Sequence, residues 1–313
     1  MLAELRDRLF ERIDGNQRWV LTLLDPNHPV ASTHPLHLDR LTGRQPVPEI
    51  LAIPRDDRMS DPDSHPRLLV LRRPEDRGHP DAELLELTMD CALKRRLSIN
   101  GAYVCGWLVV GVPPEEIASQ IRRSCILIDA AAGRRKVVPL FEPHRMALAS
   151  RLAPPQWLAR WLGAICSWFL IDACGQLKEI QPGLHEAQTT DSPDHEFWRA
   201  QSRVKQAREV LLAMVKAEQV LPVDCEIRID ASLQAAYREG LSDTEDIIFF
   251  ATNHMTLSSG WHSHPAIRAC IASARSGQMA LTHSMTSLPD KVLEELSNSN
   301  SDLATRRSVP RSS

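Results

Sequence analysis

The stretch "YVCGWLVVGVPPEEIASQI", residues 103–121, decides the fold class of this chain. Its first part, residues 103–112, carries no charge and is strongly apolar, which predicts a buried strand. The "PPEE" that follows, residues 113–116, opens a helix, because proline fits the first helical turn and acids favour the positive end of the helix dipole. A buried strand leading into an amphipathic helix is the basic unit of an α/β layer.

The same alternation extends outward from this stretch as far as about residue 180. Strands are expected at residues 18–26, 66–74, 136–141 and 165–172, and helices at residues 2–13, 81–97, 144–152 and 157–162. Residues 26–66 are rich in proline and histidine, which favours a loop with at most short elements. The pattern predicts an α/β (or α+β) N-terminal lobe, residues 1–180, in which helices flank a mixed sheet.

A second region follows a polar, turn-rich linker at residues 181–194. Helical patterns dominate residues 195–296, with Asp230 expected to cap one helix and a capping box, Ser242 with Glu245, expected to open the next. Residues 297–313 are polar and are expected to be a disordered tail. The sequence therefore predicts a mainly helical C-terminal lobe.

The composition limits the kind of partner this protein has. The 313 residues are 43% hydrophobic and 25% charged, with a net charge of -3, so a real core is expected and a nucleic-acid partner is not. The seven cysteines include no C-x-x-C pair, which is typical of reduced thiols. No signal peptide or membrane-spanning run is recognisable, so a soluble cytoplasmic protein without a membrane partner is expected.

The familiar catalytic and cofactor motifs do not occur in the chain. There is no glycine-rich dinucleotide or phosphate loop, no G-x-S-x-G and no H-E-x-x-H. The best metal candidates are His254, His262 and His264, but no carboxylate or cysteine lies beside them at ligand spacing, which favours surface or capping histidines. The sequence predicts neither a metal, nor a cofactor, nor catalytic residues.

The segment "KVVPLFEPHRMALASRL", residues 136–152, places charge at a strand-to-helix joint. Geometry alone explains Glu142, because an acid favours a helix start, but Glu142 beside Arg145 also makes a small charged site. Trp157 and Trp161 share a face of the next helix, where they either belong to the core or contact a partner. Glu142, Arg145, Trp157 and Trp161 are therefore the candidate partner-binding residues.

Three segments together resemble a family of unknown-function domains found in type VI secretion loci. "VLTLLDP" (20–26) resembles its opening strand, residues 106–127 its central strand and helix, and residues 137–177 its most recognisable block. The family's aromatic-acid-Pro-Arg signature reads Phe141-Glu142-Pro143-His144 here, with Arg145 one residue further on. The likeness spans roughly residues 17–180, with a weaker match near residues 242–271.

The resemblance implies a function that the composition does not. Members of this family are effector chaperones, or adaptors, which bind a toxic effector in the producing cell and load it onto the VgrG spike; they are not enzymes. The expected partners are therefore an effector toxin and VgrG. Two alternatives stay open at this stage: an immunity-type protein that neutralises a toxin, and a metal-dependent hydrolase using the three histidines.

Overall fold

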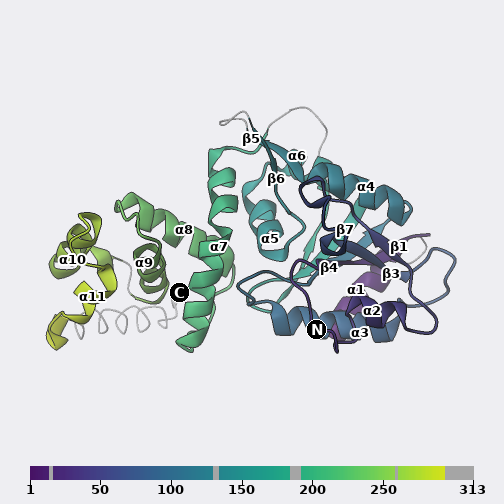
Figure 1. Cartoon of the computed structure of the whole chain (residues 1–313), viewed down its shortest axis with the longest axis horizontal. Helices are drawn as coiled ribbons and strands as arrows, with labels where there is room; N and C mark the ends of the chain where they lie inside the picture. The colour runs from purple at the N-terminus through teal and green to yellow at the C-terminus, as the bar shows by residue number, and fades with distance from the viewer. Residues whose placement is uncertain (14–16, 130–133, 184–191, 258–259, 293–313) are drawn as a thin grey trace, which may run out of the picture. The chain divides into compact units, whose positions relative to one another are not determined.

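A computed structural model of the chain describes residues 1–13, 17–129, 134–183, 192–257 and 260–292 (Figure 1). The chain divides into two compact units, Met1–Ser202 and Arg203–Ser313, and the division falls inside one long helix. The helical region was expected to begin at residue 195, eight positions before this division. Residues 184–191 of the expected linker and the whole expected tail, residues 297–313, lie outside the described residues.

The secondary structure of the first unit alternates helices and strands, as expected. Its elements are α1 (Leu2–Ile13), β1 (Trp19–Leu24), α2 (Leu38–Thr42), β2 (Ile50–Ala52), β3 (Arg67–Arg72), α3 (Ala82–Arg95), β4 (Val104–Val110), α4 (Pro114–Ser124), β5 (Ile126–Asp129), β6 (Arg134–Val137), α5 (Pro143–Leu152), α6 (Pro155–Leu162), β7 (Ile165–Ile171), β8 (Leu177–Ile180) and the start of α7 (His195–Lys216). The fold class α/β is confirmed.

The main sheet has the strand order β2-β3-β1-β4-β7-β8, and every pairing within it is antiparallel. The expectation of a mixed sheet is therefore wrong. Strands β3 and β4 run in the same direction and α3 connects them, but β1 lies between them and is antiparallel to both. The order strand, helix, strand is present, as the sequence pattern indicates. Strands β3 and β4 do not form the parallel pair that this order usually produces, because β1 lies between them.

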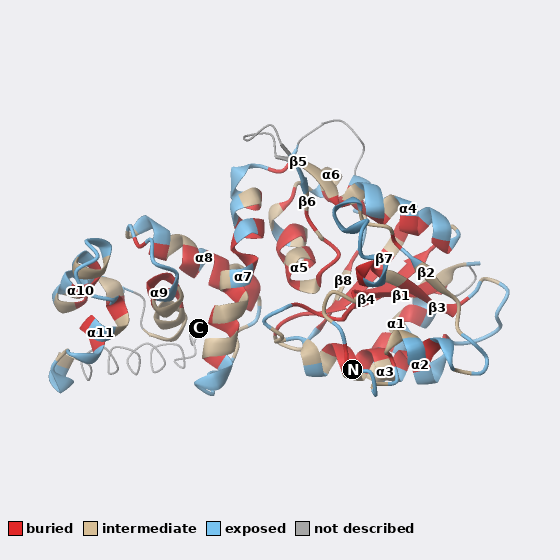
Figure 2. Ribbon diagram, in the orientation of Figure 1, coloured by how far each residue is buried: buried red, intermediate tan, exposed pale blue. Residues whose placement is uncertain are grey.

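Helices cover both faces of this sheet (Figure 2). Helices α1 and α3 bury one face, where Trp107 lies in the core, and helices α4, α5 and α6 bury the other, where Trp168 lies in the core. Both indoles are fully buried. The Trp107 Nε1 donates a hydrogen bond to Thr88 Oγ1 on α3 at 2.9 Å, which fixes that helix on the sheet.

Gly106, in the middle of β4, is required by the packing around it. Its φ is +145°, a backbone conformation that residues with a side chain rarely adopt. A Cβ added there would lie 2.4 Å from the Phe169 carbonyl oxygen and 2.5 Å from Trp168 Nε1. The glycine thus allows β7 and its tryptophan to approach the central strand closely.

The strand expected at residues 136–141 is only partly present. Strand β6 ends at Val137, and it pairs with β5 in a separate two-stranded sheet rather than with the main sheet. Strand β5 was not expected at all. Residues 138–141 lead without regular structure into α5.

The second unit is helical in its described part, as expected. Its elements are the rest of α7, α8 (Cys225–Arg238), α9 (Thr244–Thr256), a 3-10 turn (Trp261–Ser263), α10 (Pro265–Arg275) and α11 (Leu281–Thr286). Asp230 does not cap a helix, because α8 begins five residues earlier. The cap of α9 is Asp243, whose side chain accepts from the backbone N–H groups of Glu245 and Asp246.

A buried ion pair links α7 to α8 within the second unit. The Arg203 guanidinium donates to both carboxylate oxygens of Asp230, at 2.8 and 2.9 Å, and the side chains are 8% and 5% exposed. Gln234 donates a further hydrogen bond to the same carboxylate at 3.0 Å. Two buried charges in such a bidentate arrangement depend on each other, because either alone would remain desolvated.

We expect the substitution Asp230→Asn to destabilise the second unit by about 3 kcal/mol or more, because it leaves the buried Arg203 unpaired. Replacing both partners, as R203M/D230L, should recover most of that loss. Glu4→Gln, which removes the exposed ion pair of Glu4 with Arg8, serves as the control and should change stability by under about 0.5 kcal/mol. The measurement is urea unfolding followed by circular dichroism. Near-wild-type stability of Asp230→Asn would contradict the role given to this pair.

Candidate partner-binding site

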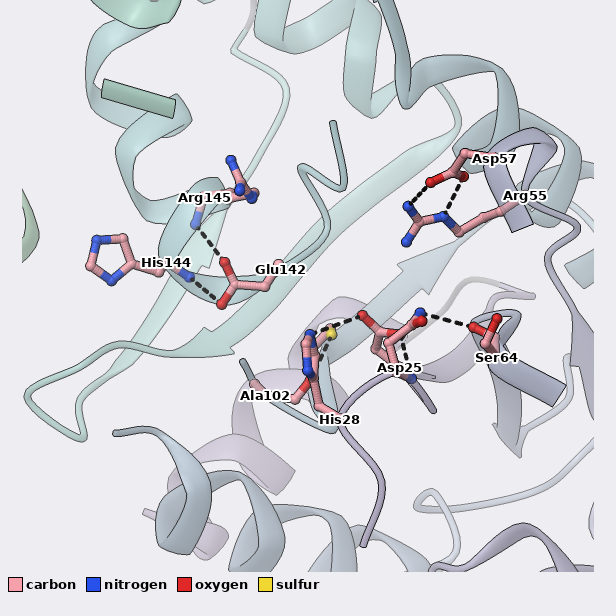
Figure 3. A network of polar contacts seen from close by, with 11 residues as sticks. Asp25, His28, Arg55, Asp57, Ser64, Ala102, Glu142, His144 and Arg145 are labelled. Atoms are coloured by element: carbon pink, nitrogen blue, oxygen red, sulfur yellow. Dashed lines mark hydrogen bonds and ion pairs between the residues drawn. The ribbon is translucent and has the colours of Figure 1, made fainter. Parts of the chain in front are cut away.

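The Glu142 carboxylate caps helix α5. Its two oxygens accept hydrogen bonds from the backbone N–H groups of His144, at 3.4 Å, and Arg145, at 3.2 Å, and the residue is 4% exposed (Figure 3). Pro143 occupies the first helical position, where a backbone N–H is not needed. The acid at the joint therefore satisfies the open end of a helix, which is the geometric explanation considered for it in the sequence.

The Arg145 side chain holds the first turns of α7 against α5, within the first unit. Its Nη1 donates to the backbone carbonyl of Gln201 at 2.7 Å and to the side-chain oxygen of Gln201 at 3.3 Å. The Gln201 amide in turn donates to the Arg145 carbonyl at 3.1 Å. Gln201 is 3% exposed, so this reciprocal contact is internal. Arg145 is thus engaged in an intramolecular contact that its sequence position did not predict.

The two tryptophans of α6 have different environments. Trp161 is 5% exposed, donates from Nε1 to the Ser124 carbonyl at 2.9 Å and packs on Trp168 with ring centroids 5.6 Å apart. Trp161 therefore belongs to the core, which is the alternative considered for it in the sequence analysis, and its ring has almost no accessible surface. Trp157 is half-buried and packs edge-on against Phe197 of α7 at 5.4 Å. Of the pair, only Trp157 retains accessible surface.

A second polar cluster, missed at the sequence level, lies at the end of β1. Asp25 is 2% exposed, and its Oδ1 accepts from the backbone N–H of Asn27 at 3.1 Å and from the Asn27 side chain at 2.7 Å (Figure 3). The Asn27 amide also donates to the Ser64 carbonyl at 2.9 Å, and His28 Nε2 lies 3.6 Å from Asp25 Oδ2. The Asp-Pro that follows an apolar run was the available signal. These contacts tie the loop after β1 to the loop that contains Ser64, and Asp25 is closed to solvent.

The three candidate metal-binding histidines do not converge. His264 is the N-cap of α10, and its Nδ1 accepts from the Ala266 N–H at 3.3 Å. The rings of His254 and His262 face each other with centroids 5.3 Å apart, beside Phe250 and Trp261. Within the described ranges, no group of three or more histidine, cysteine or acidic side chains is arranged to hold a metal ion.

The described surface of the second unit carries an apolar loop between α7 and α8. Val220 is 91% exposed and Val223 is 61% exposed, and we call these two side chains the valine loop. The flanking residues Glu218 and Asp224 both adopt left-handed backbone conformations, with φ of 53° and 58°. Non-glycine residues pay a conformational cost there, and such strain is often found where a loop has a binding role. Sequence reasoning missed this loop because its pattern resembles an ordinary helix connection.

Comparison with known proteins gives no relative for this chain. No protein-family model matches it, and neither a curated protein nor a solved structure does. No helix among the described residues is long and apolar enough to cross a membrane. The functional argument therefore depends on the chain itself.

We expect Glu142→Ala to lower the stability of the first unit by about 1 to 2 kcal/mol, because two N–H groups at the start of α5 lose their acceptor. Glu142→Gln, which keeps one acceptor oxygen, should lose less. Urea unfolding of the purified variants measures both. Equal stability of Glu142→Ala and the wild type would show that the capping bonds contribute nothing.

The second unit should lose stability at mildly acidic pH. Burial lowers the pKa of His254, and the nearby His262 and Arg238 lower it further. Histidines of the unfolded chain titrate near about pH 6.5, so below that pH the unfolded chain binds more protons than the folded chain. The contribution of neutral His254 to the free energy of unfolding is therefore complete above about pH 6.5 and is lost as the pH falls below it.

Hydrogen exchange of the α9 amides, corrected for intrinsic rates, measures this effect. We expect protection in the wild type to fall between about pH 7.5 and pH 5.5, and to fall less in His254→Gln, which cannot titrate. The same loss of protection in both proteins would assign the acid sensitivity to other groups.

Proposed function

We propose that this protein is a cytoplasmic type VI secretion adaptor, which binds a toxic effector and assists its loading onto the VgrG spike. The support for this family comes from the residues that resemble it, roughly 17–180. The support for a binding function comes from one structural observation: the valine loop carries the two most exposed large apolar side chains of the second unit's described part. Apolar side chains exposed together on one loop are the kind of group that serves as an anchor in a protein-protein contact.

The two units have separate tasks in this proposal. The first unit carries the family-like segments, so it makes the contact that all adaptors share, with the spike or with a common effector element. The second unit resembles the family least, so it distinguishes one effector from another. A few apolar anchors generally dominate the affinity of such an interface, and Val220 and Val223 are the most exposed candidates there.

We expect the double substitution V220E/V223E to abolish co-purification of the effector encoded in the same locus, because it puts charge into an apolar contact. Folding should be unaffected, since both side chains are exposed. The matched control is Val47→Glu, which changes a valine of the first unit that is 60% exposed and should leave binding intact.

VgrG distinguishes an adaptor from an immunity protein in the same experiment. An adaptor should form a three-component complex with effector and VgrG, whereas an immunity protein should bind the toxin and exclude VgrG. Retention of the effector by V220E/V223E at unchanged affinity would move recognition to the first unit, where Trp157 is then the residue to change. Failure of the wild type to bind any effector of its locus would overturn the adaptor proposal.

A further inference from the structure

The hairpin formed by β5 and β6 stands apart from the main sheet (Figure 1). Two-stranded hairpins alone are marginally stable in water. The stability of this hairpin therefore depends on packing at its base, where the two strands join the rest of the first unit. There, Val138 is 3% exposed, and Leu127 and Val137 pack partly against the core on the α4 side of the sheet. Beyond its base, within the part of the chain that the structure describes, no third strand pairs with the hairpin.

The register of the hairpin identifies which backbone groups point outward. Val138 N donates to the Cys125 carbonyl at 2.8 Å, so these opposite residues form a hydrogen-bonded pair. Such pairs alternate with non-hydrogen-bonded ones along an antiparallel ladder. Arg135 and Val137 therefore belong to the second kind, and their N–H and C=O groups point away from β5. The outer edge of β6 thus offers two donors and two acceptors.

The same edge is positively charged. Arg135 and Lys136 are both exposed, and neither forms an ion pair with any residue that the structure describes. Arg135 and Lys136 therefore make the outer strand of the hairpin basic, on a chain whose net charge is -3.

We propose that the outer edge of β6 accepts an extended acidic segment of a partner protein as an additional strand. The partner's backbone pairs with the outward N–H and C=O groups of Arg135 and Val137, and its carboxylates lie near Arg135 and Lys136. Strand addition supplies affinity through the main chain, and charge selects an acidic sequence. A free strand edge is the feature that such a segment needs.

A nucleic acid fits this surface less well. A chain that binds nucleic acid through its phosphates usually carries a long basic stripe and a high net positive charge. The β6 edge has only two described exposed cations, and the whole chain has a net charge of -3. Nucleic acid also makes no use of a row of strand-edge amides. The proposal concerns the first unit alone and does not depend on the adaptor function.

The test uses the full-length protein and a fluorescein-labelled peptide of about ten residues in which pairs of glutamates alternate with pairs of threonines, so that an extended strand carries carboxylates on both faces. Binding is followed by fluorescence anisotropy. We expect R135E/K136E to weaken binding at least about tenfold, and a rise from about 50 to 200 mM salt to weaken it as well. The control R6E/R77E reverses two exposed cations, one on α1 and one in the loop after β3, and should leave affinity unchanged.

A second pair of probes separates strand addition from simple charge attraction. These two peptides have the same sequence, and each carries N-methyl groups on every second backbone amide. The odd-numbered amides are methylated in one peptide and the even-numbered amides in the other. The two sets of amides lie on opposite edges of an extended strand, so one of the two peptides cannot donate hydrogen bonds to β6. That peptide should bind at least about tenfold more weakly than the unmodified one, since it loses its backbone hydrogen bonds.

Three results would overturn the proposal. Equal binding of the unmodified and both N-methylated peptides would show that the peptide does not bind by strand addition. Unchanged binding by R135E/K136E, whose folding is checked by circular dichroism, would show that the positive charge of the β6 edge does not contribute to binding. Tighter binding of single-stranded oligothymidine than of any acidic peptide would assign the surface to nucleic acid. Because the assay contains no effector or VgrG, its failure leaves the adaptor proposal to be judged by co-purification.

Discussion

Burial of β4 from both sides is the constraint on which the first unit depends. All seven residues of this strand are buried, and the neighbouring β1 has a nearly continuous apolar sequence for the same reason. Side chains alternate across a sheet, so a strand can be apolar throughout only if helices cover both faces. The Trp107 and Trp168 indoles fill the two sides, and Gly106 allows Trp168 to approach β4 closely. Polar side chains therefore lie mainly at the ends of helices and strands, and the candidate sites are found there.

That constraint explains how far the sequence predicts the fold. Apolar runs followed by capped helices locate most elements of the first unit, and the change in pattern beyond residue 180 locates the helical region. Strand direction was not predictable, because an apolar run covered on both faces looks the same whether its neighbour is parallel or antiparallel. Strand β5 is four residues long and carries no alternation strong enough to separate it from the end of α4.

Glu142 and His264, which the sequence suggested for partner binding and metal binding, both have a structural role. Glu142 and His264 both lie at a helix start, and both accept hydrogen bonds from backbone N–H groups that the helix itself cannot satisfy. Asp230 presents the opposite case, since the sequence suggested a cap and the structure gives it a buried ion pair with Arg203. Local spacing predicts caps because they are local. A pair 27 residues apart depends on how two helices pack, which spacing does not encode.

The features with the clearest capacity to bind are those that internal packing leaves unused. Most buried polar groups named above have a partner inside their own unit, whereas Val220 exposes apolar surface and the β6 edge exposes backbone groups and positive charge. These two surfaces differ in chemistry and belong to different units. An apolar anchor suits a folded partner with a complementary pocket, while a basic strand edge suits an extended acidic segment. A protein that must hold one partner and contact another has use for two surfaces that do not compete for the same ligand.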